Sequence, residues 1–468
     1  MSPRKTKLIC TLGPATSSPE VVRSLIEAGA AIFRLNMSHA THDWVREMVG
    51  TIRTESRSLD AEVATLVDLQ GPSIRTGDVE GKVALRKGDL VEFRNADLAP
   101  GAALSVTTNY DGLHGDLSEG DLMLVDNGEL HFRVQRIEPG RVLGEVLTEG
   151  AMGSRRHINL PGILVHLPVL TEKDERDIAL AADIDADFVA ISFVRDAAHV
   201  ALLREKLRAL GCGASVVAKI EDQEAVKHLA EIVTEADAVM VARGDLGIEV
   251  HLEELPVVQR RIVAECARIG RKVIVATHLL ESMVENPVPT RAEVTDVANA
   301  VFEQADAIML SGETSVGRYP VKCVETLDRI ARRIERETVP ESSETLELKS
   351  EKEQLVRSAV LLAQSLDRAS LLVFTARGVL ANLAANLRPG RAPIFAFSPD
   401  AAVVRSLVMN RAVLPVRFDL DDDPAENTRR ALAHLREKGL VEAGDPVVIV
   451  SDVLLPGFDN GAVLLRHA

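Results

Sequence analysis

The chain has 468 residues, of which 46% are hydrophobic and 3% aromatic, and its formal net charge is −16. This length predicts about two to four domains with cores of aliphatic side chains. The negative charge disfavours nucleic acid or an anionic membrane as a partner. There is no run of 18 apolar residues and no apolar signal core at the N-terminus, and the four cysteines are scattered. We therefore expect a cytoplasmic protein with reduced thiols.

The first 70 residues alternate between short apolar strands and amphipathic helices. Strands are expected at 7–12, 30–35 and 63–67. Ser18 and Pro19 have the residue types of a helix N-cap and a first helical position. This alternation is typical of a parallel α/β fold.

From residue 71 to about 167 the pattern changes to alternating apolar and polar residues with repeated turn dipeptides. Asp126-Asn127-Gly128, between LMLV and ELHFRV, is a strong hairpin signal. The sequence therefore predicts a small β-rich domain, residues 72–167, inserted after the third strand.

Strand–helix alternation resumes at Thr171, the expected start of a helix. Five further strands are then expected, at 187–191, 216–220, 238–242, 272–276 and 307–310. With the first three they give eight strands, each followed by a helix, which is the pattern of a (β/α)8 barrel. Residues 1–71 and 168–338 should form this barrel.

The acidic segment 338–351 has no periodicity and resembles a linker. A new alternation follows it, with a helix at 352–366 and strands at 371–374, 394–397, 413–416 and 447–450. Residues 339–468 are therefore expected to form a third domain, a small doubly wound α/β sheet.

Charged residues cluster where two neighbouring strands end. Lys219 and Glu221 are two residues apart and share one strand face, and Gly244 and Asp245 follow the next strand. All strands of such a barrel end at the same face, so two carboxylates and an ammonium should converge there. Two carboxylates suit Mg²⁺ or Mn²⁺, and a lysine beside them suits the charge on a transferring phosphoryl group. The alternative is a surface salt-bridge cluster.

The second strand predicts a further group of polar side chains. Arg34, Asn36 and Ser38 alternate and are expected on one strand face, where arginine suits phosphate and the amide and hydroxyl oxygens suit a cation. Asp68 ends the third strand at the same rim.

Four other residues leave alternatives open. Arg75 is either a structural charge at the entry to the inserted domain or a second phosphate contact. Arg156, in a basic pair, is either solvated or faces a nucleotide. Thr277, at a strand end, is a proton relay or a cap, and His39 is expected to be a local hydrogen bonder.

These residues lie in motifs that resemble those of pyruvate kinases over essentially the whole chain. The motifs are TKLICTLGPAT (6–16), FRLNMSHATH (33–42), DLQGPSIRTG (68–77), NLPG (159–162), LTEKD (170–174), ISFVR (191–195), AKIED (218–222), VMVARGDLGIEV (239–250), ATHLLESM (276–283), NPVPTRAEVTDVANAV (286–301) and IMLSGETSVGRYP (308–320). The resemblance implies transfer of the phosphoryl group of phosphoenolpyruvate to ADP, giving pyruvate and ATP. It also implies a barrel A domain, a mobile B lid, a regulatory C domain and a homotetramer.

The resemblance assigns roles at the substrate. It implies that Glu221 and Asp245 hold the divalent metal with phosphoenolpyruvate, that Lys219 stabilises the transferring phosphoryl group, and that Arg34 binds phosphate. It places Gly244 and Thr277 at the substrate carboxylate, with Thr277 near the enolate carbon. It assigns Ser311 and Glu313 to a water network that supplies the proton.

The resemblance also assigns cation and nucleotide contacts. Monovalent-cation ligands are implied at Asn36, Ser38 and Asp68, with Leu69 beside them. Nucleotide contacts are implied at Asn36, His39, Arg75 and Arg156.

Two departures bear on potassium. Ser73 stands where the family commonly has Glu or Lys, and Glu there accompanies potassium dependence. Leu69 stands where potassium-dependent members tend to have Thr. K⁺ dependence is therefore expected to be incomplete.

Two rival functions use the same barrel. A metal-dependent lyase or aldolase would hold an enolate with Glu221 and Asp245, but it leaves Lys219 and the lid without a role. A non-catalytic metabolite-sensing relative would be expected to lack one of the key residues Lys219, Glu221, Asp245 and Thr277, and all four are present.

The C-terminal domain generates the first prediction. Relatives activated by sugar phosphates carry a loop like T-x-S/T-G-R-S/T, whereas residues 375–380 read TARGVL. The side chains of Val379 and Leu380 cannot donate to phosphate oxygens, and each lost charge-assisted hydrogen bond costs about 1.5–3 kcal/mol. The segment 456–460 is expected to bring an acidic residue, Asp459, to this region as well. We expect no appreciable activation by sub-millimolar fructose 1,6-bisphosphate; a several-fold lower half-saturation concentration of phosphoenolpyruvate would contradict this.

Overall fold

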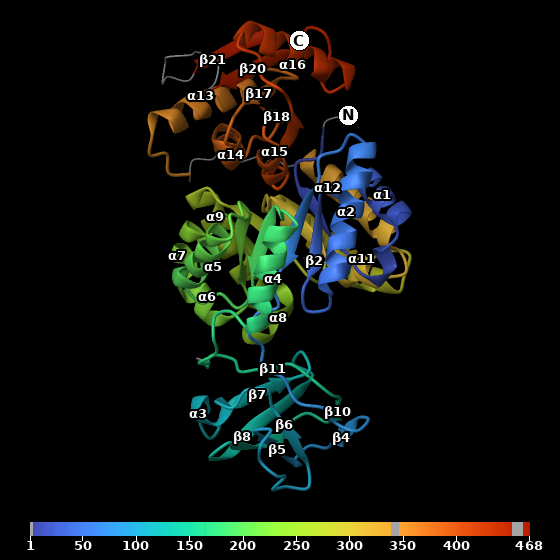
Figure 1. Ribbon diagram of the computed structural model, residues 1–468, viewed down its shortest axis with the longest axis vertical. Coiled ribbons are helices and arrows are strands. Elements are labelled where there is room, and N and C mark those ends of the chain that lie inside the picture. Colours follow the sequence, from blue (N-terminus) through green and yellow to red (C-terminus); the bar gives the residue numbers. More distant parts are fainter. Residues whose placement is uncertain (1–2, 164, 338–345, 452–461) are drawn as a thin grey trace.

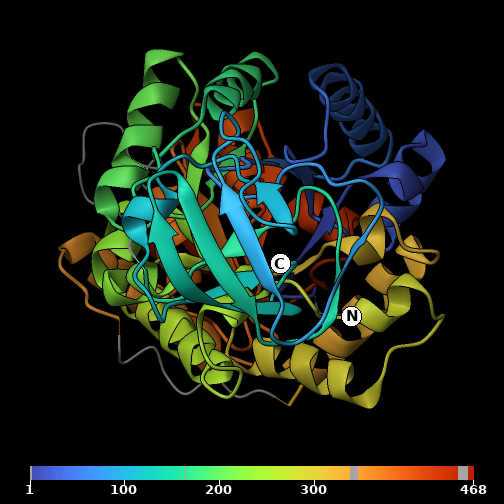
Figure 2. The same ribbon diagram turned by 90° about the horizontal axis from the view of Figure 1, so that it is seen from below.

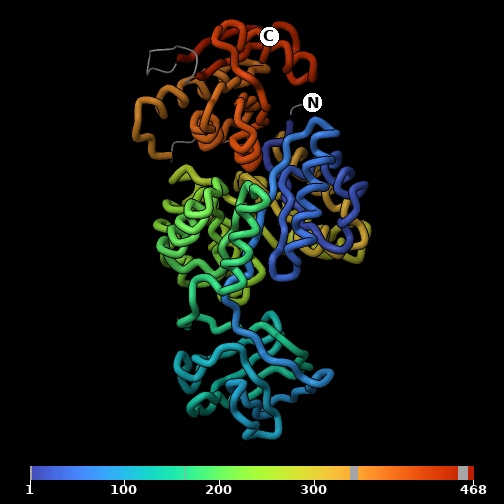
Figure 3. Tube along the Cα trace, viewed as in Figure 1, coloured from blue at the N-terminus to red at the C-terminus, as the bar shows by residue number. Residues whose placement is uncertain are grey.

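The computed structural model describes residues 3–163, 165–337, 346–451 and 462–468. Three bodies are stacked along the long axis, with a β-rich lid at one end, a barrel in the middle and an α/β domain at the other end (Figures 1 and 3). Most of the expected linker, residues 338–345, and the loop 456–460 lie outside the described residues. Among the described residues, no helix combines the length and apolar character needed to cross a bilayer.

Eight parallel strands close into a barrel in chain order, which confirms the expected fold. They are nearly all buried, because side chains fill the barrel and helices cover it. The strands are β1 (Lys7–Thr11), β2 (Ile32–Asn36), β3 (Ala64–Asp68), β12 (Phe188–Ile191), β13 (Ser215–Ile220), β14 (Ala238–Ala242), β15 (Lys272–Ala276) and β16 (Ala307–Leu310).

The barrel helices begin largely at side-chain caps. Ser18 accepts a hydrogen bond from the N–H of Val21, as expected, and Thr171 forms a reciprocal capping box with Asp174. The surrounding helices are α1 (Pro19–Glu27), α2 (His42–Ser58), α4 (Glu172–Asp183), α5 (Ala197–Ala209), α6 (Gln223–Lys227), α7 (Leu229–Glu235), α9 (Leu255–Ile269), α10 (Arg291–Phe302) and α12 (Pro320–Glu335).

Two features of the barrel connections go beyond simple strand–helix alternation. The segment after β13 forms two helices, α6 and α7, which meet at His228. The residues directly after β14 form the short helix α8 (Arg243–Glu249). Three short helices complete this region: η1 (Pro14–Thr16), η2 (Glu281–Val284) and α11 (Gly312–Ser315).

The lid is built on a six-stranded sheet and a two-stranded sheet. The expected hairpin is confirmed: β7 and β8 pair antiparallel, and Asp126, Asn127 and Gly128 between them have φ values of 57°, 54° and 83°. Seen from the lid end, its strands lie across the end of the barrel (Figure 2). The lid elements are β4 (Val83–Leu85), β5 (Leu90–Arg94), β6 (Ser105–Thr107), α3 (Leu113–Asp116), β7 (Leu122–Val125), β8 (Leu130–Glu138), β9 (Arg141–Val146), β10 (Gly150–Met152) and β11 (Ile158–Asn159).

The C-terminal sheet has the order β19-β18-β17-β20-β21, with apolar clusters on both faces. This confirms the α/β domain, but β21 pairs antiparallel to β20 and was not expected. The elements are α13 (Glu351–Ser365), β17 (Ser370–Phe374), α14 (Val379–Asn386), β18 (Ile394–Ser398), α15 (Ala401–Leu407), β19 (Val413–Arg417), α16 (Pro424–Glu437), β20 (Pro446–Ser451) and β21 (Ala462–His467).

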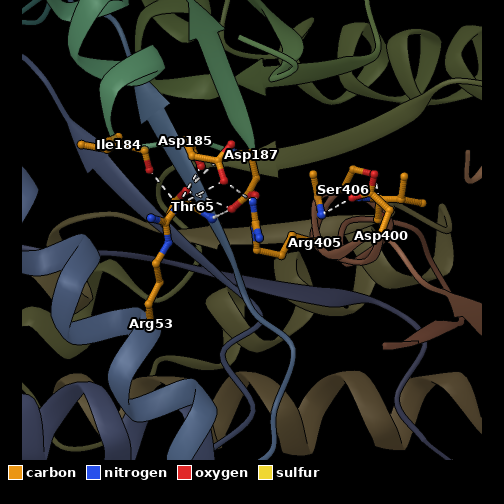
Figure 4. Close-up of polar contacts among 10 residues, drawn as sticks. Arg53, Thr65, Ile184, Asp185, Asp187, Asp400, Arg405 and Ser406 are labelled. Atoms are coloured by element: carbon orange, nitrogen blue, oxygen red, sulfur yellow. Dashed lines mark hydrogen bonds and ion pairs between the residues drawn. The ribbon is translucent and has the colours of Figure 1, made fainter. Parts of the chain in front are cut away.

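The C-terminal domain docks where the barrel strands begin. Arg405 of α15 reaches Asp187, just before β12, at 2.5 Å, and Asp185 at 2.6 Å (Figure 4). Asp187 also accepts hydrogen bonds from the N–H and hydroxyl of Thr65 at 2.8 and 3.0 Å. Burial raises the pKa of Asp187 although Arg405 acts to lower it. This arrangement makes Arg405 the compensating charge for a buried carboxylate.

The interface generates the second prediction. Arg405→Met should destabilise domain docking by about 2–4 kcal/mol, because Asp187 would stay buried without its cation. A lower urea midpoint and faster proteolysis between barrel and C-terminal domain would show this. The matched control is Lys438→Met: Lys438 pairs with Asp60 across the same boundary, but both are exposed. Equal effects of the two variants would contradict the prediction.

Candidate active site

The centre of the site is the ammonium of Lys219, near the end of β13. Its Nζ lies 2.6 Å from the hydroxyl of Ser192, 2.9 Å from a carboxylate oxygen of Glu221 and 3.3 Å from one of Asp68. Lys219 is 8% exposed and both carboxylate residues are buried. The alternative of a solvated surface salt bridge is therefore excluded.

Charge compensation keeps the buried side chains of Lys219 and Asp68 ionised. Burial acts to lower the pKa of Lys219, but the charges of Asp68 and Glu221 hold it above its ordinary value. Burial acts to raise the pKa of Asp68, but Lys219 and Arg34 hold it below its ordinary value. The ammonium thus stays charged in a water-poor site.

The pKa of Glu221 is shifted in the direction that disfavours its charged form. Burial raises its pKa to about 7; Lys219 lowers it, while the negative charge of Asp245 raises it further. One oxygen of Glu221 accepts the N–H of Phe193 at 2.7 Å. Two carboxylates that repel at a partly open position are a donor set that suits a divalent cation. No group of three or more His, Cys, Asp or Glu side chains that could hold a metal occurs within the described ranges.

Arg34 and Lys219 share Asp68 as their partner. Arg34 donates to Asp68 at 2.6 Å and to the hydroxyl of Thr11 at 3.1 Å. Two cationic side chains therefore meet at the rim of the barrel, where an anionic substrate would gain from both.

The expectation that Arg34, Asn36 and Ser38 share one strand face was wrong for Ser38. Strand β2 ends at Asn36, whose side-chain oxygen accepts the N–H of Ser38 at 3.1 Å. This turn removes Ser38 from the strand, because an Asn side chain competes with the ladder for backbone donors. Leu69 is buried, and its carbonyl accepts the hydroxyl of Ser192 at 2.8 Å.

Gly244 and Thr277 meet across two neighbouring strands. The N–H of Gly244 donates to the hydroxyl of Thr277 at 2.8 Å, and that hydroxyl donates to the carbonyl of Ala276 at 2.6 Å. Asp245 lies in the first turn of α8 rather than at a strand end. The structure thus brings Gly244, the residue before Asp245, into contact with Thr277.

Glu313 organises the loop after β16. Its two oxygens accept the N–H groups of Leu280 at 3.1 Å and Ser311 at 2.7 Å. Burial raises its pKa, although these hydrogen bonds act to lower it. The hydroxyl of Ser311 is buried and has no partner among the described residues.

The lid contributes residues from its own side. Arg75 donates to Ser73 at 3.2 Å and to the carbonyl of Arg155 at 3.1 Å. Arg156 pairs with Asp126 at 3.1 Å. Both expected nucleotide arginines therefore contact lid residues and are not joined to the Lys219 cluster by these contacts.

Two residues near the site were missed from the sequence. His157 of the lid lies 3.7 Å from Asp245 and edge-on to Phe193 at 6.0 Å; a lone histidine gave no signal. Trp44, the single tryptophan, lines a cleft of about 560 Å³ together with Asn36, His39 and apolar residues of the first barrel loop. The sequence could have pointed to Trp44 because it is the only tryptophan in the chain.

A closed parallel barrel whose rim holds a buried ammonium, an arginine and two carboxylates is typical of an enzyme that binds and transfers an anionic group. Models described as the barrel domain and the alpha/beta domain of pyruvate kinase match residues 3–324 and 353–460. The chain belongs to the pyruvate kinase family and is an enzyme with pyruvate kinase function.

Individual relatives agree over nearly the whole chain. Plastidial pyruvate kinase 3 of Arabidopsis thaliana is 39% identical, covering 96% of this chain and 79% of the relative. The pyruvate kinase of Geobacillus stearothermophilus is 37% identical, covering 96% and 78%. That of Methylorubrum extorquens is 36% identical, covering 98% and 96%.

The geometry generates the third prediction. Lys219→Met should lower the rate of phosphoryl transfer by about 10²–10³-fold or more, because an oriented charge is lost from a water-poor site. Steady-state kinetics of the purified variant would measure this, with circular dichroism to show that it is folded. Lys206→Met, which removes a partly exposed pair with Glu175 on the barrel exterior, is the matched control. Near-normal turnover of the Lys219 variant would refute its role.

Proposed function

We propose that the Lys219 cluster transfers the phosphoryl group of phosphoenolpyruvate to ADP, giving pyruvate and ATP. The observation that carries this is the buried ammonium of Lys219 between Asp68 and Glu221, with Arg34 on the same aspartate. Negative charge develops on the phosphoryl oxygens as ADP attacks in line, and these two cations neutralise it. The lid covers this face and excludes water, which would otherwise compete with ADP.

Glu221 and Asp245 would hold Mg²⁺ or Mn²⁺. Their mutual repulsion and the partial exposure of Asp245, whose side chain is 35% exposed, fit a metal that also takes substrate oxygens. When bound there, the metal supplies positive charge to the phosphoryl group and to the enolate oxygen.

The substrate carboxylate is proposed to lie at Gly244 and Thr277. The hydrogen bond between them holds the Thr277 hydroxyl at the rim of the barrel, in the region where the enolate would form. Thr277 would stand near the enolate carbon. Ser311 is proposed to belong to a water network that delivers the proton, because its buried hydroxyl has no hydrogen-bond partner in the part of the chain that the structure describes. Glu313 would hold that loop in place.

The nucleotide is proposed to bind in the cleft of Trp44, Asn36 and His39, with Arg75 and Arg156 approaching from the lid. The cleft is large enough for a base, and the half-buried indole offers a stacking surface. Quenching of Trp44 fluorescence by ADP would follow directly from this placement.

We further propose the domain boundaries 1–71 with 168–338, 72–167, and 339–468, supported by the separate apolar clusters of the three bodies. A cytoplasmic location and a homotetramer are proposed as well. Support for self-association comes from exposed apolar side chains on and before the neighbouring helices α9 and α10: Leu252, Val257, Val288, Val294 and Phe302. Light scattering tests the oligomeric state.

One assay tests the reaction. Purified protein with phosphoenolpyruvate, ADP and Mg²⁺ should form pyruvate and ATP in equal amounts, and both should vanish without ADP. Pyruvate formation without ATP would favour lyase-type chemistry, and absence of both products would favour a metabolite-sensing relative.

Potassium generates the fourth prediction. Asp68 already has two cationic partners, Arg34 and Lys219, and the side chain of Leu69 offers no oxygen. A K⁺ ion held by Asn36, Ser38 and Asp68 would add a third positive charge, so we expect weak or partial activation. Initial rates in potassium against tetramethylammonium buffer measure this, and complete loss of activity without K⁺ would contradict it.

A further inference from the structure

Arg243 is a buried arginine between four elements of the barrel. It directly follows β14 and is 7% exposed. Its Nε donates to the carbonyls of Ala276 at 3.1 Å and Thr277 at 3.2 Å, and a terminal nitrogen also donates to Thr277. The other terminal nitrogen pairs with Asp296 of α10 at 2.7 Å and reaches Gln259 of α9 at 3.4 Å. One guanidinium thus ties two helices to the end of β15.

The residue held by this guanidinium has an unusual backbone. Thr277 has φ of 65° and the next residue, His278, has φ of 54°. A β-branched residue in the left-handed region is a rare, strained conformation, which persists only where surrounding contacts enforce it. The contacts that enforce it here are the bonds of Arg243 to the Thr277 carbonyl and of Gly244 to its hydroxyl.

We propose that Arg243 is a positioning residue for phosphoryl transfer, which keeps Thr277 in its strained conformation so that its hydroxyl faces the substrate carboxylate. The inference rests on the proposed role of Thr277. Arg243 acts through Thr277, since its five hydrogen bonds go to protein groups.

Arginine chemistry explains why this residue type is needed. A planar guanidinium can address carbonyls with one edge and a carboxylate with the other, whereas a lysine ammonium is a point donor. A purely structural ion pair would need only Asp296. The other edge of the guanidinium donates to the carbonyls of Ala276 and Thr277. The ion pair does not need these bonds, and they act on a residue of the site.

Arg243→Lys should keep the positive charge but lose the planar guanidinium with its two donor edges. We expect kcat to fall about 10–100-fold, because a displacement of the Thr277 hydroxyl by about 1 Å would lower the rate by this much. KM for ADP should change little. Asp296→Asn should lower kcat several-fold, because the guanidinium stays but its anchor weakens. Thr277→Ala is the reference variant.

The double variant Arg243→Lys with Thr277→Ala separates positioning from general stability. If Arg243 acts through Thr277, kcat of the double variant equals that of Thr277→Ala alone. The matched control is Arg204→Lys: Arg204 also makes several bonds, to Glu235 and Asp237, but on α5. Its effect on kcat should be negligible both alone and combined with Thr277→Ala.

Multiplicative effects of the Arg243 and Thr277 variants, or a kcat of Arg243→Lys within about twofold of the parent, would overturn the inference. If Arg243→Lys does not fold, an unchanged kcat in Asp296→Asn overturns it instead. A normal kcat in Thr277→Ala would refute the proposed role of Thr277 itself, which distinguishes the two failures.

Discussion

The ion cluster around Lys219 is the constraint on which the site depends. It joins β3 through Asp68, β13 through Lys219 together with Glu221 directly after that strand, and the residue after β12 through Ser192. Burial opposes every one of these charges, so each is stable only with its partners in place. Loss of Lys219 would leave the buried carboxylate of Glu221 without its cation. The cluster therefore holds the rim together and at the same time supplies the charge that the reaction needs.

The two ends of the barrel have separate tasks. Strand β12 shows this most clearly: Asp187, just before it, pairs with Arg405 of the C-terminal domain, and Ser192, just after it, contacts Lys219. Only four strand residues separate the two charged regions. Domain docking and chemistry are thus supported by the same short, fully buried strand, which has little freedom to move.

Residue patterns were sufficient wherever local chemistry decides structure. Buried β-branched runs located all eight barrel strands to within about two residues, and the Asp126-Asn127-Gly128 turn located the lid hairpin. Patterns failed where another contact overrides local preference. The Asn36 side chain turns the chain before Ser38, and α8 forms although its sequence contains two glycines, which normally weaken a helix. Strand β21 forms because it pairs antiparallel with β20. This pairing cannot be read from the residues of β21 alone.

By itself, the sequence determined the barrel, the inserted lid, the third domain and the chemical types at the strand ends, because periodicity and residue type are local properties. The tertiary structure decided which of these side chains meet. It showed that Asp68 is shared by Arg34 and Lys219, that Asp245 stands close enough to Glu221 to raise its pKa, and that Arg243 clamps Thr277. These relations depend on distances between residues far apart in the chain, and only closure of the barrel sets those distances.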